Sequence, residues 1–113
     1  MARVDEIIGT PGEIDWYTYP LVGQVDYVIT ALGASNGNTL LDPAVAVYDS
    51  VGNFITFGDD SWVLGEDPML QFKAPYTDTY FIGVFDMANS TGSYSLVIDQ
   101  AGVPIFFGGF PGT

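Results

Sequence analysis

The chain has 113 residues, no cysteine, no histidine and a formal net charge of −12 at pH 7. The missing cysteine excludes disulfides and thiolate metal sites, and the missing histidine excludes Ser-His-Asp and Cys-His triads and the most common general base. Because only two residues are basic against fourteen acidic ones, binding to nucleic acids or to anionic membrane surfaces is disfavoured.

Short runs rich in Val, Ile, Tyr, Phe and Thr alternate with turn signals along the whole chain, which predicts strands. No stretch repeats apolar residues at helical period over about ten residues. The predicted strands are, in chain order, residues 14–21, 25–32, 44–48, 54–57, 69–73, 79–85 and 93–98. We expect residues 1–9 to be an N-terminal arm, residues 10–100 to form one domain, and residues 101–113 to be a C-terminal tail or an extra edge strand.

Apolar and polar residues alternate within these strands, which indicates one buried and one exposed face. Val25, Tyr27 and Ile29 share a face, for example, while Asp26 points the other way. Strands this short with this alternation are typical of a sandwich. The sequence therefore predicts an all-β, antiparallel β-sandwich of about seven to eight strands. No apolar run approaches the roughly 20 residues of a membrane span.

Carboxylates gather at one end of the predicted sandwich. If successive strands alternate in direction, one end carries Glu13, Asp15, Asp42, Asp59, Asp60, Glu66, Asp67 and Asp86, and the opposite end carries Asp26, Asp49, Asp78 and Asp99. Carboxylates held close together repel one another unless a cation bridges them, and Ca²⁺ takes oxygen ligands. We expect a calcium site, with the candidate ligands Asp15, Asp59, Asp60, Glu66 and Asp67.

Two alternatives to the calcium site remain open. The acids of residues 59–67 match neither an EF-hand loop nor a nonapeptide calcium repeat, so they could simply be a solvated loop. A pair of carboxylates could also serve a glycosidase, although a domain of this size leaves little room for a sugar cleft.

Several aromatic residues are predicted to face outward, among them Trp16, Tyr48 and Phe57. The candidate ligand-binding residues are Trp62, in the acidic loop, and Phe81 and Phe85, which flank Gly83 on one strand face. A cluster of exposed rings would mark a contact surface. The alternative is that these rings cover a sheet or pack under the C-terminal tail.

The order of the motifs resembles that of bacterial pre-peptidase C-terminal (PPC) domains. The segments that carry this resemblance are residues 12–19, which look like the D-W-F-x-F opening strand, and residues 42–53, 59–60, 70–75, 79–84 and 92–98. They follow one another in order between about residues 10 and 99. Asp15 matches the acid of the opening strand and Asp59 and Asp60 match the paired acids, whereas Asp78 stands where many relatives carry glycine.

The resemblance implies a jelly-roll-like sandwich appended to secreted proteases and other exported proteins, without catalytic activity of its own. Related domains of clostridial collagenases bind collagen and calcium, with metal ligands on an N-terminal arm and near the opening strand. Asp5 and Glu6 are arm acids here, but their spacing differs from that of the collagenase arm.

We therefore expect a noncatalytic accessory module, stabilised by calcium, in an extracellular or secreted protein. The N-terminus lacks the apolar core of a signal peptide, so the protein is either cytosolic or part of a longer exported chain. The few lysines, the high acidity and the many Gly, Asn, Thr and Tyr residues favour the second interpretation, an extracellular module. Its partner would be an extracellular polymer or a neighbouring catalytic domain, whose folding and export it could support. The alternatives are a carbohydrate-binding or adhesion module and a purely structural spacer.

Overall fold

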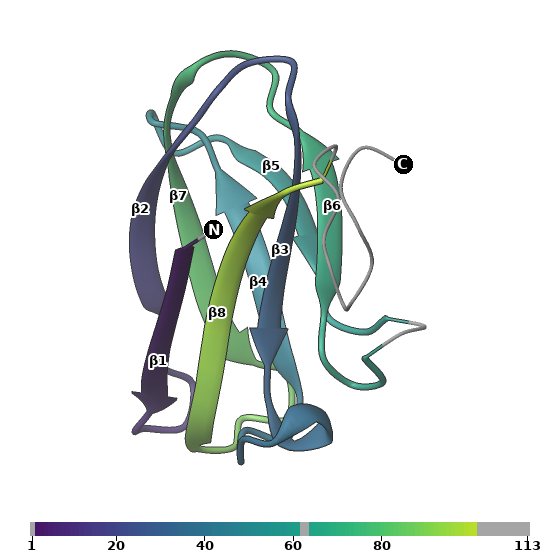
Figure 1. The fold of residues 1–113 in the computed structure, drawn as a ribbon. Coiled ribbons are helices and arrows are strands. Elements are labelled where there is room, and N and C mark those ends of the chain that lie inside the picture. Colours follow the sequence, from purple (N-terminus) through teal and green to yellow (C-terminus); the bar gives the residue numbers. More distant parts are fainter. Residues whose placement is uncertain (1, 62–63, 102–113) are drawn as a thin grey trace, which may run out of the picture.

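The computed structural model describes residues 2–61 and 64–101, which form two four-stranded antiparallel sheets packed face to face (Figure 1). The first sheet has the order β1 (Ala2–Ile8), β8 (Gly92–Gln100), β3 (Asp26–Leu32), β6 (Met69–Lys73). The second has the order β2 (Asp15–Leu21), β7 (Asp78–Asp86), β4 (Pro43–Tyr48), β5 (Phe54–Gly58). The predicted antiparallel β-sandwich is confirmed.

All seven predicted strands are present, with ends that differ from the expected ones by one or two residues, and a short 3-10 turn, η1 (Ala34–Asn36), follows β3. Residues 2–8, which we expected to be part of an arm, instead form the edge strand β1 on β8, with Ala2 opposite Ile98 and Ile8 opposite Gly92. This strand was hard to recognise because only Ile8 of its seven residues is fully buried. The predicted tail beyond residue 101 lies outside the described residues.

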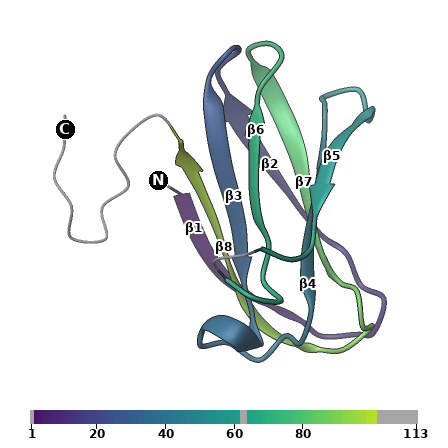
Figure 2. The same ribbon diagram turned by 90° about the vertical axis from the view of Figure 1, so that its right-hand side faces the viewer.

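The core lies between the sheets and consists of side chains that alternate along the strands as the sequence predicts. The first sheet contributes Ile29, Tyr94, Leu96 and Ile98, and the second contributes Val45, Val47, Tyr80, Ile82 and Val84. Burying an aliphatic side chain of this size stabilises the fold by about 1.5–3 kcal/mol. Figure 2 shows the two layers from the side, with β4 and β5 on the far side of the molecule from β1 and β8.

The strand register brings three loop connections to the same end of the second sheet. Pro43, at the start of β4, pairs with Asp86, at the end of β7, and Val45 pairs with Gly58, at the end of β5. The acids that precede β4 and follow β5 therefore meet there. Among the described residues, no helix is long and apolar enough to cross a membrane.

Candidate functional site

Three carboxylates converge at this end of the second sheet. Asp42 directly precedes β4, Asp60 follows β5, and Glu66 lies in the connection to β6. One carboxylate oxygen from each lies within 4.8 Å of the others. Ca²⁺ typically takes about six to eight oxygen ligands from carboxylates, carbonyls and water, and the three carboxylates of this acidic cluster of Asp42, Asp60 and Glu66 are ligands of that chemical type.

Asp42 is the least exposed member of the acidic cluster. Its Oδ1 atom is buried and has no hydrogen-bond partner among residues 2–61 and 64–101. Burial, followed by the negative charges of Asp60, Glu66 and Asp59, raises the pKa of Asp42 to about 6. A carboxyl group in this position is stabilised either by a nearby cation, when it is charged, or by protonation, which removes the charge.

The acidic cluster includes two of the five predicted metal ligands, Asp60 and Glu66, and adds Asp42. Asp59 lies close enough for its charge to raise the pKa of Asp42, but it is not among the three converging groups. Asp67 is fully buried, and its Oδ2 accepts a hydrogen bond of 2.5 Å from Asn36 Nδ2. The position of Asp42, directly before a strand that starts at this end, was the signal that could have identified it.

Asp15 does not belong to the acidic cluster. It lies in a second acidic region, between β1 at the edge of the first sheet and β2 at the edge of the second. Asp15, Glu13 and Glu6 line an open, polar hollow of about 370 Å³ together with neighbouring residues of β1 and β2. The hydroxyl of the buried Tyr94 donates a hydrogen bond of 2.6 Å to Asp15 Oδ2. Hydrogen bonding to Asp15 raises the pKa of Glu13, whose Oε1 also accepts hydrogen bonds from the backbone N–H of Gly9 and Thr10.

The outer face of the second sheet carries a set of neighbouring aromatic rings, which we call the aromatic strip. Its members are Trp16 on β2, Phe81 and Phe85 on β7, Tyr48 on β4, and Phe54 and Phe57 on β5. Ring centroids are 5.4 Å apart for Trp16 and Tyr48, 5.6 Å for Tyr48 and Phe54, and 6.1 Å for the stacked pair Phe57 and Phe85. These spacings are those of favourable aromatic pairs.

Small residues make room for the strip. The register places Trp16 opposite Gly83, Gly83 opposite Ala46, and Ala46 opposite Phe57 in one row across the sheet. A Cβ atom on Gly83 would lie 3.0 Å from Trp16 Cζ3, so the indole lies directly over the glycine. The Trp16 ring therefore fills the space above Gly83, between Phe81 and Phe85 on the same strand face.

Two of the three predicted ligand-binding residues belong to this strip. Phe81 and Phe85 are partly buried within it, whereas Trp16, Phe54 and Phe57 are its exposed members. Trp62 lies outside the described residues. Phe54 was missed because a bulge between Val47 and Tyr48 shifts the pairing of β4 with β5, which the alternation of the sequence does not reveal.

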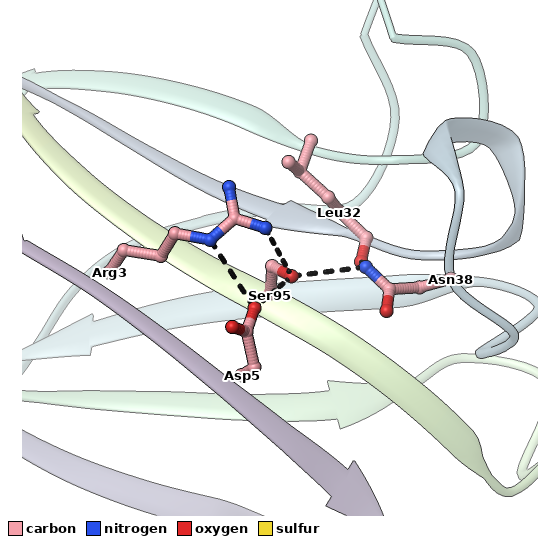
Figure 3. A network of polar contacts seen from close by, with 5 residues as sticks. All are labelled: Arg3, Asp5, Leu32, Asn38 and Ser95. Carbon is pink, nitrogen blue, oxygen red and sulfur yellow. Dashed lines mark hydrogen bonds and ion pairs between the residues drawn. The ribbon is translucent and has the colours of Figure 1, made fainter.

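The outer face of the first sheet is polar by contrast. Arg3 Nη2 donates a hydrogen bond of 3.1 Å to Ser95 Oγ, Ser95 Oγ donates to Asp5 Oδ1 at 2.5 Å, and Asn38 Nδ2 donates to both Ser95 Oγ and the Leu32 carbonyl (Figure 3). Arg3 also forms an exposed ion pair with Asp5 at 3.3 Å. The two faces of the sandwich thus differ sharply in chemistry.

The comparisons with known proteins identify the fold. No family model matches the sequence, and no curated protein matches it. Among solved structures, the pre-peptidase C-terminal domain of a collagenase from Bacillus anthracis matches with a TM-score of 0.69 and 17% sequence identity, covering 87% of this chain and 88% of that chain. The predicted resemblance to PPC domains is thereby confirmed at the level of the fold.

Proposed function

We propose that the chain is a noncatalytic accessory module of an exported, extracellular protein, and that it binds a polymer or a surface through the aromatic strip. The observation that carries this proposal is the aromatic strip, in which Trp16, Tyr48 and Phe54 form one group of neighbouring rings and Phe57 and Phe85 a stacked pair, on a sandwich whose fold is that of a collagenase-associated domain. A purely structural spacer has no need of such a strip, because exposed aromatic rings in a cluster are typical of contact surfaces.

The noncatalytic role is supported by the composition of the whole chain. Because these 113 residues include no histidine and no cysteine, no serine or threonine among them has a histidine base to activate it, and they offer no thiol nucleophile. Arg3, one of the two basic residues, is already engaged with Asp5 and Ser95.

The binding role predicts that Trp16→Ala and Phe57→Ala each weaken retention on an insoluble polymer about tenfold or more, because each removes one of the exposed rings of the strip. Retention is measured by pull-down on collagen, cellulose and chitin. Both variants should melt within a few degrees of the unchanged protein, since both side chains are substantially exposed.

Met69→Ala is the matched control, because Met69 is an exposed apolar residue of β6 on the other sheet. It should retain full binding. If no polymer is retained, and Trp16→Ala and Phe57→Ala instead lower the melting temperature strongly, the rings serve only to cover the sheet and the spacer alternative is correct.

We also propose that calcium stabilises the module by binding at the acidic cluster. The support is the convergence of three carboxylates within 4.8 Å and the buried Asp42 Oδ1 atom, which has no hydrogen-bond partner in the part of the chain that the structure describes. A divalent cation would offset the mutual repulsion of these groups and would join the start of β4 to the connection between β5 and β6.

A further inference from the structure

The aromatic strip has a carboxylate-rich border and no cation of its own. Phe57 and Phe85, the stacked pair of the strip, are the second-to-last residues of β5 and β7, next to the end where Asp42, Asp59 and Asp60 are found. The only two basic residues of the chain, Arg3 and Lys73, are on β1 and β6 of the other sheet. The face is therefore apolar and aromatic, with only negative charge at its edge.

We propose that the aromatic strip docks a positively charged polypeptide segment, with Arg or Lys side chains lying over its rings and reaching toward Asp59 at its border. This inference rests on the proposed binding function and names the partner. A guanidinium or ammonium group within about 6 Å of a ring centroid is attracted by the ring quadrupole, more so when it is desolvated. The net charge of −12 also attracts cationic partners at long range and repels anionic ones.

A segment fits this surface better than a second copy of the chain. Trp16, Phe54 and Phe57 are 52%, 59% and 41% exposed, which leaves about 300 Å² of aromatic surface on these three rings. A stable globular interface needs about 800 Å² from each partner. A second copy would also carry a net charge of −12, so the two copies would repel each other.

The test uses a twelve-residue peptide of alternating arginine and glycine, and the same peptide with citrulline, a neutral analogue of arginine, in its place. Binding is measured by fluorescence anisotropy in EDTA and 150 mM NaCl. We expect the arginine peptide to bind at least tenfold more tightly than the citrulline peptide. Phe57→Leu, which keeps an apolar side chain but removes the ring, should weaken binding about fivefold or more.

Charge-reversal variants separate a local contact from general attraction to an acidic protein. Asp59→Lys and Asp99→Lys change the net charge equally, but Asp99 is on β8 of the opposite sheet. We expect Asp59→Lys to weaken binding about tenfold and Asp99→Lys to weaken it less than threefold. If both variants weaken binding equally, or if Phe57→Leu has no effect, the attraction is nonspecific and the inference is wrong.

The proposed function and this inference can fail separately. If the citrulline peptide or a neutral polysaccharide such as hydroxyethylcellulose binds as tightly as the arginine peptide and still depends on Phe57, the strip is a binding surface and only the assigned partner is wrong. If no probe and no polymer depends on Trp16 or Phe57, both are wrong.

Discussion

Calcium should raise the melting temperature by roughly 10 °C or more, and matched NaCl should not. A ligand that binds only the folded state at one hundred times its Kd contributes about 2.7 kcal/mol, and a domain of this size gains several degrees for each kcal/mol. Asp60→Asn should remove most of this gain, because Asp60 is one of the three converging carboxylates. The measurement is thermal unfolding in millimolar CaCl₂ and in NaCl of equal ionic strength.

Asp42→Asn gives the sharper version of this test, because its effect changes sign with calcium. Without calcium, the substitution removes a carboxylate whose pKa is raised to about 6 by burial and by its neighbours, so it should stabilise the fold by about 1–3 kcal/mol. With calcium, it should lose the gain shown by the unchanged protein. Asp99→Asn, on the opposite sheet, is the control and should keep the full calcium response. Identical curves in CaCl₂ and NaCl would show that the acids are only a solvated surface.

Asp49→Ala should destabilise the fold strongly, lowering the melting temperature by roughly 10 °C. Asp49 begins the turn between β4 and β5 and is almost fully buried. Its Oδ1 accepts hydrogen bonds from the backbone N–H of Val51 and Asn53, and its Oδ2 accepts from Asn53 Nδ2 and the Tyr76 hydroxyl. Alanine leaves all of these donors without their partner. The turn of the hairpin that carries Phe54 and Phe57 therefore loses the hydrogen bonds that hold its conformation.

The pH dependence of stability identifies the role of Asp49 independently. The backbone hydrogen bond from Asn53 is the main cause that lowers the pKa of Asp49 below its ordinary value. Because the folded pKa lies below the unfolded one, the stabilisation is complete above the unfolded pKa of about 3.9 and is lost as the pH falls through the folded pKa. Denaturant unfolding between pH 6 and pH 2 should therefore show a smaller loss of stability for Asp49→Asn than for the unchanged protein. Equal losses would mean that Asp49 is not a source of acid sensitivity.

The strands could be predicted because the alternation of apolar and polar residues is a local property. A strand such as β3 shows Tyr27, Ile29 and Ala31 on its buried face at every second position, and turn residues mark both of its ends. The strand β1 escaped prediction for the same reason. It lies at a sheet edge, most of its side chains remain exposed, and its sequence therefore lacks the alternation that burial imposes.

The strand positions and the buried faces follow from local patterns along the chain. Which acids meet is set by the tertiary structure, because strand order and register join residues that are distant in the chain. It brings Asp42 to Asp60 and Glu66 and places Asp15 instead beside Tyr94. The aromatic strip also depends on strand order and register. Its rings lie on one face of the sheet because four strands align Trp16, Gly83, Ala46 and Phe57 in a single row, and no local pattern encodes that alignment.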